Sequence, residues 1–169
     1  MKTVVRLLWT VPLLFALCGC DRLTHFRLVS EEYGFSVEFP EKPIEHTDTN
    51  YQGLSKTLWT LEKDASKEFY SAEATSYKEA LNPSPDWIPD QEVLGSVGIQ
   101  ITDQKRFKLR ATSTGTEVPA IATTAKQLST GSILSSIYIV DRRTMISVRA
   151  RTNDERHRRE FLNSLTMIR

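Results

Sequence analysis

The chain lacks several features that each indicate a class of protein. Its only two cysteines, Cys18 and Cys20, lie near the N-terminus, which excludes a disulfide framework through the rest of the chain. Its 22 basic and 21 acidic residues nearly cancel, which argues against a nucleic-acid-binding protein. The largely apolar run from Leu7 to Leu17 is too short for a membrane-spanning helix, which needs about 20 apolar residues.

Motifs of common catalytic and cofactor sites are also missing. The sequence has no glycine-rich phosphate loop, no dinucleotide-binding Gly-x-Gly-x-x-Gly pattern and no Gly-x-Ser-x-Gly nucleophile motif. Its three histidines, His25, His46 and His157, show no metal-ligand spacing. We therefore expect no metal, no cofactor and no catalytic residue in this chain.

The N-terminal segment has the pattern of a secretory signal. Lys2 and Arg6 precede the apolar run, and a small residue, Gly19, stands directly before Cys20. Leu17-Cys18-Gly19-Cys20 resembles the lipobox, the pattern recognised by the lipoprotein signal peptidase.

This resemblance implies a lipid-anchored protein of the bacterial cell envelope. Residues 1–19 are then a signal peptide, and Cys20 becomes the first mature residue and carries acyl chains such as palmitate. Asp21 resembles the inner-membrane retention signal of enterobacteria-like sorting. We expect the protein on the periplasmic, or another extracytoplasmic, face of a bacterial membrane.

The chain without residues 1–19 has the size and charge of one ordinary domain. Its 150 residues include 20 basic and 21 acidic side chains, so it is close to neutral. A chain of this length buries roughly 68–70% of its unfolded surface. We assign residues 20–30 to the lipidated cysteine and a short tether, and residues 31–169 to a single domain.

Alternating apolar and polar residues predict a protein made mostly of strands. Phe35, Val37 and Phe39 face one way and Ser36 and Glu38 the other, and Pro40 ends this strand. The same reasoning predicts further strands at 44–49, 54–62, 68–77, 105–112, 119–126, 133–140 and 144–151.

Two helices are predicted among these strands. Val93, Leu94, Val97 and Ile101 have helical spacing, although nearby glycines weaken this segment. The Thr-x-x-Glu pattern from Thr152 predicts the start of a final helix, with Phe161, Leu162 and Leu165 as its apolar anchors. The order of elements predicts an α+β fold, in which two helices pack on an antiparallel sheet.

Two stretches of the sequence resemble PsbP-like domains. Residues 33–43, YGFSVEFPEKP, are similar to the Gly-Phe-x-Val-x-Phe-Pro strand that opens such domains. Near the C-terminus, Glu-Phe-Leu-Asn-Ser-Leu is similar to their Phe-Leu-x-Ser-Phe ending, with Leu165 in place of the usual aromatic residue. The resemblance implies an α-β-α sandwich with an antiparallel sheet. It implies no function, because this fold serves unrelated roles.

The one uneven charge feature is a group of seven arginines within 18 residues. As a solvated surface, it would carry local ion pairs such as Arg156 with Glu160 and Asp154 with Arg158, each at i, i+4. As a binding surface, it would contact anionic lipid headgroups or an acidic partner, because the guanidinium group binds phosphate and carboxylate bidentately. The seven are Arg142, Arg143, Arg149, Arg151, Arg156, Arg158 and Arg159.

Three functions are compatible with this sequence. The first is a non-enzymatic, lipid-anchored protein that binds or helps to assemble another envelope component. The second is a hydrolase with a cleft that the sequence does not reveal. The third is a carrier of a small ligand, held in a pocket between sheet and helix. A nucleophile bonded to a base would favour the second, and an apolar pocket with convergent polar groups the third.

Overall fold

A computed structural model describes residues 25–49, 54–64, 67–81 and 98–169. The described strands form a seven-stranded antiparallel sheet, in the order β3-β4-β5-β9-β8-β7-β6, and a three-stranded sheet, in the order β1-β2-β10. The strands of the large sheet are β3 (Ile44–Thr49), β4 (Ser55–Lys63), β5 (Glu68–Ser76), β6 (Ile99–Arg110), β7 (Glu117–Gln127), β8 (Ile133–Asp141) and β9 (Thr144–Arg151). Those of the small sheet are β1 (Phe26–Ser30), β2 (Phe35–Phe39) and β10 (Thr166–Met167).

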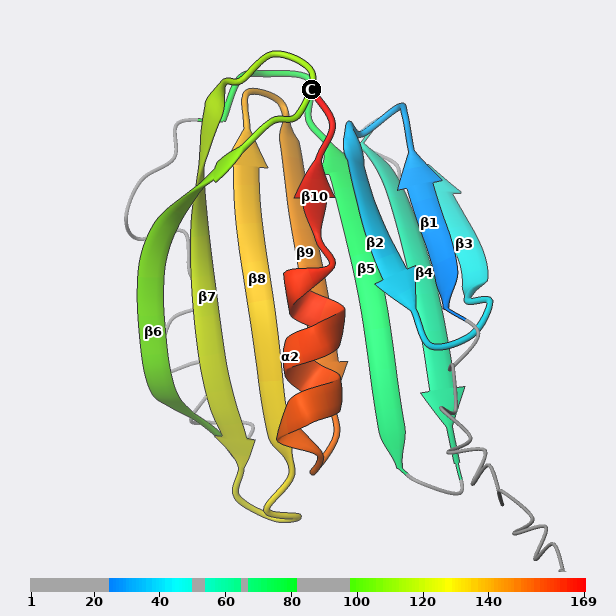
Figure 1. Cartoon of the computed structure of the whole chain (residues 1–169), viewed down its shortest axis with the longest axis vertical. Helices are drawn as coiled ribbons and strands as arrows, with labels where there is room; N and C mark the ends of the chain where they lie inside the picture. The colour runs from blue at the N-terminus through cyan, green and yellow to red at the C-terminus, as the bar shows by residue number, and fades with distance from the viewer. Residues whose placement is uncertain (1–24, 50–53, 65–66, 82–97) are drawn as a thin grey trace, which may run out of the picture.

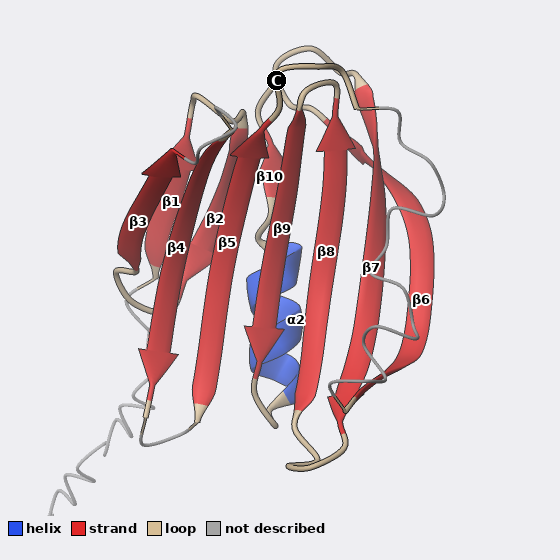
Figure 2. Ribbon diagram, turned by 180° about the vertical axis from the view of Figure 1, so that it is seen from behind, coloured by secondary structure: helices blue, strands red, loops and turns tan. Residues whose placement is uncertain are grey.

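The described helix, α2 (Glu155–Asn163), and the small sheet lie over the same face of the large sheet. We call this the inner face of the large sheet. The small sheet covers the β4–β5 side of that face, while α2 lies over β8 and β9 (Figure 1). Seen from behind, the large sheet stands in front of both (Figure 2).

Alternation along the strands places the apolar side chains between these layers. On β9, Ile146, Val148 and Ala150 are fully buried and face inward, while Arg149 and Arg151 face outward. Phe35, Val37 and Phe39 of β2 are fully buried as well. The strand that the sequence predicts before Pro40 is therefore confirmed as β2, together with its inward residues.

Phe161 joins the helix, the small sheet and the large sheet at one point. Its ring contacts Phe39 of the small sheet and Tyr70 of the large sheet, with centroid distances of 5.0 and 5.1 Å and edge-to-face geometry. A second aromatic contact lies further along the core, where Trp59 meets Tyr33 and Phe35. The Trp59 indole N–H donates to Glu45 Oε2 at 2.8 Å, which satisfies the polar atom of a buried ring.

A β-bulge in β6 separates two parts of that strand. The pairing with β7 shifts between Ile101 and Asp103, and the extra residue, Thr102, donates its hydroxyl hydrogen to Thr124 O. Beyond the bulge, Phe107 and Leu109 face inward with Asp103 and Lys105. Before the bulge, Ile101 pairs with Ala125 on the outer face of the sheet.

The structure differs from the sequence prediction at three helix or tether boundaries. Residues 26–30, predicted as tether, form β1 and pair with β2. The end of the predicted helix at 93–101 is wrong, because Ile99 and Ile101 begin β6, and its first part lies outside the described residues. The final helix begins two residues later than predicted, with Asp154 as its N-cap.

The later start of the final helix has a physical cause. The hydroxyl of Thr152 donates a hydrogen bond to the Glu68 carboxylate and accepts one from the backbone N–H of Asp154, so it does not cap the helix. The Asp154 carboxylate instead accepts the N–H groups of Arg156 and His157. The two-residue strand β10 pairs with β2, a long-range contact that alternation in so short a segment does not reveal. Of the two predicted helices, the described part of the chain contains only the final one, α2, and the described end of the other is part of β6.

In the described part of the chain, no helix combines the length and the apolar character needed to cross a bilayer.

We expect Phe161→Ala to lower the free energy of unfolding by about 3–5 kcal/mol, since it removes a buried ring that packs on two other rings. Phe107→Ala is the matched control, because Phe107 is only partly buried. It should cost about 1 kcal/mol. Urea unfolding followed by circular dichroism measures both losses, and equal losses would contradict the central role of Phe161.

Candidate functional site

Helix α2 divides the inner face into two depressions. The first, the His157 pocket, has a volume of about 840 Å³ and lies between α2, the start of β1, the end of β2 and the β4–β5 end of the large sheet. The second, the β6 groove, has a volume of about 690 Å³ and lies between α2 and the inner side of β6, β7 and β8. Both fall within the size range of small-molecule sites.

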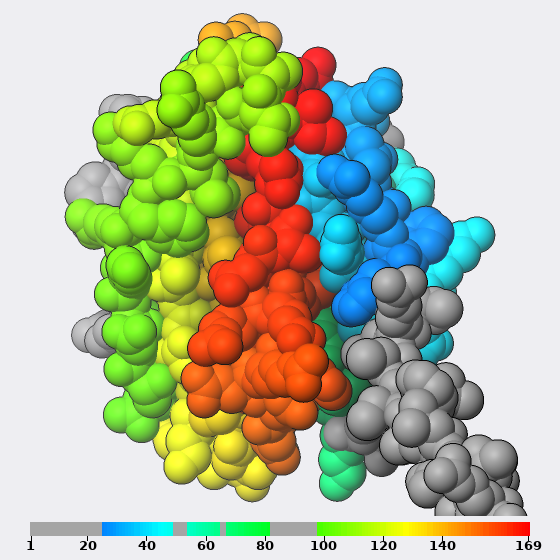
Figure 3. Space-filling model, viewed as in Figure 1, coloured from blue at the N-terminus to red at the C-terminus, as the bar shows by residue number. Residues whose placement is uncertain are grey.

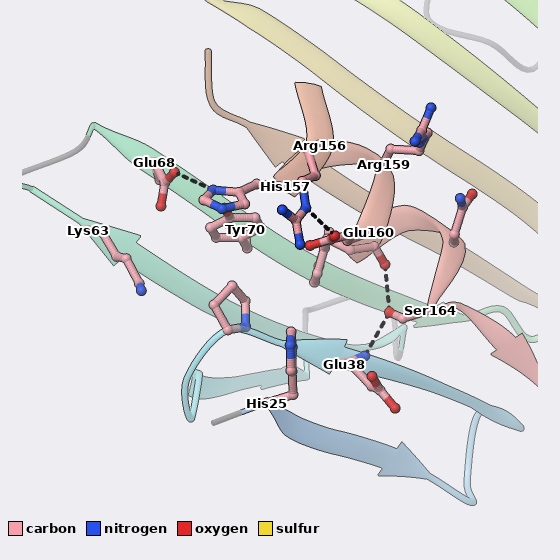
Figure 4. A pocket seen from close by; sticks show the side chains of 13 residues that line it. His25, Glu38, Lys63, Glu68, Tyr70, Arg156, His157, Arg159, Glu160 and Ser164 are labelled. Atoms are coloured by element: carbon pink, nitrogen blue, oxygen red, sulfur yellow. Dashed lines mark hydrogen bonds and ion pairs between the residues drawn. The ribbon is translucent and has the colours of Figure 1, made fainter. Parts of the chain in front are cut away.

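Glu68 organises the His157 pocket (Figure 4). Its side chain is only 12% exposed, and Oε1 accepts the Thr152 hydroxyl at 3.1 Å and lies 3.2 Å from His157 Nδ1. Its carboxyl group also takes the hydrogen bond of the Tyr70 hydroxyl. Glu68 therefore ties β5 to the loop before α2 and to the first turn of that helix.

Burial and charge act together on Tyr70. Its side chain is 1% exposed, and burial raises the pKa of its phenol far above the ordinary value, with the neighbouring charge of Glu68 adding to the effect.

Two carboxyl groups of the α2 region have lowered pKa values. At the start of α2, the hydrogen bond from the backbone N–H of His157 lowers the pKa of the Asp154 carboxyl. At the next turn, Arg156 Nε donates to Glu160 Oε1 at 2.7 Å, which lowers the pKa of Glu160.

The His157 pocket has a carboxylate–histidine pair but no nucleophile joined to it. In the described part of the chain, no hydroxyl or thiol hydrogen-bonds to His157. The lining hydroxyl of Ser164 donates to Phe161 O at 2.6 Å and accepts the backbone N–H of Glu38 at 2.9 Å. These bonds tie the end of α2 to β2. The polar groups that make these bonds thus hold the helix in place.

The β6 groove changes in character along its length. One end is lined by charged side chains, and the other by apolar ones. Because β6 and α2 run in the same direction (Figure 1), both walls show this change in the same order. Figure 3 shows α2 and β6 standing apart on this face of the molecule. The charged lining residues are Asp103, Lys105, Glu155, Arg158 and Arg159, and the apolar ones toward the other end are Phe107, Leu109, Leu162 and Leu165. Two further apolar residues, Ala122 and Ile137, lie level with Lys105 in the sheet. Uncharged polar residues also line the groove, namely Thr123, Thr124, Ser135, Ser136 and Asn163.

The structure does not gather the seven arginines into one surface. Arg149 and Arg151 lie on the outer face of the large sheet, where Glu73 and Glu62 pair with them at 3.7 and 3.6 Å. Three others, Arg156, Arg158 and Arg159, belong to α2 on the inner face. The last two, Arg142 and Arg143, form the β8–β9 turn at the opposite end of β9 from Arg151. A single contact surface for anionic headgroups is therefore not formed.

Two expected ion pairs on α2 have different outcomes. The pair between Arg156 and Glu160 is confirmed. The expected pair between Asp154 and Arg158 is replaced, because Arg158 Nη1 donates to the carbonyl oxygen of Thr152. Cys20 and Asp21, the predicted lipidation and sorting residues, lie outside the described residues.

The contacts around Glu68 could not be found from sequence, because His157 is 89 residues away along the chain. The sequence partly indicates the groove residues of β6. Lys105, Phe107 and Leu109 alternate with polar residues on a predicted strand, which indicates a shared face. On the opposite wall, Leu162 and Leu165 are predicted as apolar anchors of the final helix, but the sequence does not show that they face β6.

Comparison with known proteins identifies the fold alone. No protein-family model and no curated protein sequence matches this chain. Among solved structures, that of cyanobacterial PsbP (CyanoP) from Synechocystis is similar, with a TM-score of 0.52 and 10% sequence identity. The match covers 91% of this chain and 98% of that one. The chain therefore has a PsbP-like fold, with mostly antiparallel strands, as the sequence resemblance implies.

We expect Tyr70→Phe to reduce the loss of stability at alkaline pH. The phenol ionises near pH 10 in the unfolded chain, while its pKa in the folded protein is far higher. Its stabilising contribution is therefore complete below pH 10 and declines as the pH rises above that value. Urea midpoints at pH 9 and pH 11 should fall further in the wild type than in Tyr70→Phe, and an identical fall in both proteins would contradict this account.

Proposed function

We propose that this chain is a lipid-anchored, non-enzymatic protein of the bacterial cell envelope, and that its PsbP-like domain binds another envelope component. The observation that carries this proposal is the sequence Leu17-Cys18-Gly19-Cys20 after a positively charged start and an apolar run. Acyl chains on Cys20 would attach the protein stably to a membrane, since two or more chains give lasting anchorage.

The distance between Cys20 and the domain supports this proposal. Only four residues separate Cys20 from His25, the first described residue. Five residue steps span at most roughly 18 Å, at about 3.5 Å per residue. The domain is then held close to the membrane surface, where it meets components of the envelope and not of the cytoplasm.

The β6 groove is the surface that best fits a binding role. Partly buried apolar side chains from β6, β7 and α2 lie together there, and such a grouping of accessible apolar side chains is typical of a binding site. The same observation favours a second candidate function, the carrier of a small ligand, because an apolar hollow with convergent charged groups is the usual form of such sites. A hydrolase has no comparable support.

We expect Cys20→Ser to abolish incorporation of labelled palmitate in a bacterium that produces the chain, because the serine cannot accept the thioether-linked lipid. Cys18→Ser is the matched control, since serine is also small, and it should be labelled like the wild type. Gel fluorography after immunoprecipitation measures the label. Absence of label from the wild type, or equal label in Cys20→Ser, would disprove the anchor.

Asp21 supports a second expectation, concerning the membrane in which the protein resides. In a host with enterobacteria-like sorting, the wild type should fractionate with the inner membrane, and Asp21→Ser should move to the outer membrane. Sucrose-gradient separation of the two membranes measures the distribution. Recovery of the wild type in the outer membrane would show that Asp21 does not act as a retention signal.

A further inference from the structure

We propose that the β6 groove binds an anionic amphiphile, a molecule with one long apolar chain and a negatively charged head group. The inference rests on the binding role proposed above and names its ligand class. Its basis is the order of side chains along the two walls of the groove.

The apolar end of the groove is a concentrated feature. Six partly buried hydrophobic residues border the core in the described part of the chain, and four of them line this groove. Leu165, which is 6% exposed, lies on the opposite wall, and Ile137, which is 8% exposed, lies in the sheet level with Lys105. A surface of this kind gains stability when an apolar chain covers it. The four partly buried residues are Phe107, Leu109, Ala122 and Leu162.

The charged end of the groove favours a negative head group. Lys105, Arg158 and Arg159 outnumber Asp103 and Glu155 among its lining residues. Arg158 already donates to the carbonyl oxygen of Thr152, while Lys105 on β6 and Arg159 on α2 line opposite walls. A carboxylate or phosphate between these two cations would form charge-assisted hydrogen bonds with either wall.

The two ends are separated by a distance that suits a chain molecule. The side chains of Asp103, Lys105, Phe107 and Leu109 follow one another along the inward side of β6. The strand from Asp103 to Leu109 extends over about 20 Å, at about 3.4 Å per residue. Residues 155–165 supply the same order on the other wall, from Glu155 and Arg159 to Leu162 and Leu165. A ligand in the groove would therefore contact charges at one end and apolar surface along the rest.

The test uses the full chain in membranes of the bacterium that produces it. A photoactivatable hexadecanoate, with a diazirine in its chain, is added and irradiated, and the purified protein is digested for mass spectrometry. We expect cross-links in peptides that cover residues 103–110 and 158–165. A photoactivatable hexadecylamine of equal chain length should label these peptides at least about tenfold less, because its head group is positive.

Matched variants separate the two halves of the groove. Lys105→Glu should lower labelling by hexadecanoate about tenfold and raise labelling by hexadecylamine. Arg143→Glu makes the same charge change in the β8–β9 turn, outside the groove, and should leave both yields unchanged. Phe107→Ser should reduce both yields, whereas Leu61→Ala, a partly buried residue outside the groove, should reduce neither. Circular dichroism confirms that each variant is folded.

Each outcome decides between the two proposals. Cross-links outside the groove, equal labelling by the two probes or equal effects of Lys105→Glu and Arg143→Glu would overturn the amphiphile site. A groove that takes neither probe, but cross-links to a membrane protein through a photoreactive residue at position 107, would identify a protein partner in its place. The Cys20 peptide reports separately on the anchor: its acylation without groove labelling refutes only the ligand, and groove labelling without acylation refutes only the anchor.

Discussion

The division of the inner face into two depressions depends on the packing of one ring, Phe161. It contacts Phe39 from the small sheet and Tyr70 from the large one, and so fixes α2 against both. The helix is short, with nine residues, and a free peptide of that length is not stable in water. Its position therefore comes from this contact and from its two ends, where Asp154 caps the first turn and Ser164 bonds to β2. The two depressions exist because the helix stands between them.

The two depressions differ because different kinds of interaction hold their walls. On one side of the helix, the Glu68 carboxylate of β5 hydrogen-bonds to Thr152 and His157. These bonds attach the start of α2 to the large sheet. On the β6 side, the walls meet through apolar side chains that do not fill the space between them. A satisfied polar network stabilises a fold, while unfilled apolar surface is available to a ligand. The β6 side is thus the one for which we propose a binding role.

Most strands could be predicted from the sequence, whereas the surfaces they build could not. Alternation in Phe35–Phe39 and in Thr144–Arg151 predicts strands and their inward residues, because a strand with one buried face has a period of two. Alternation along one segment does not reveal which layer covers it. The arginines were close in sequence, yet β9 and α2 lie on different layers and separate them. The start of α2 was misplaced because Thr152, a good cap by type, bonds to a residue from a distant strand.

The bulge at Thr102 determines which residues of β6 share a face. Its extra residue shifts the alternation of all side chains that precede it, which keeps Ile99 and Ile101 on the outer face, away from Asp103 and Lys105. If the same residues formed a regular strand without a bulge, both isoleucines would turn toward the charged end of the groove. Deletion of Thr102 alone would leave the faces as they are, because Ile101 would then stand directly before Asp103 and alternate with it. One additional residue therefore lets a single strand present apolar side chains to one side of the sheet and a charged start of the groove to the other.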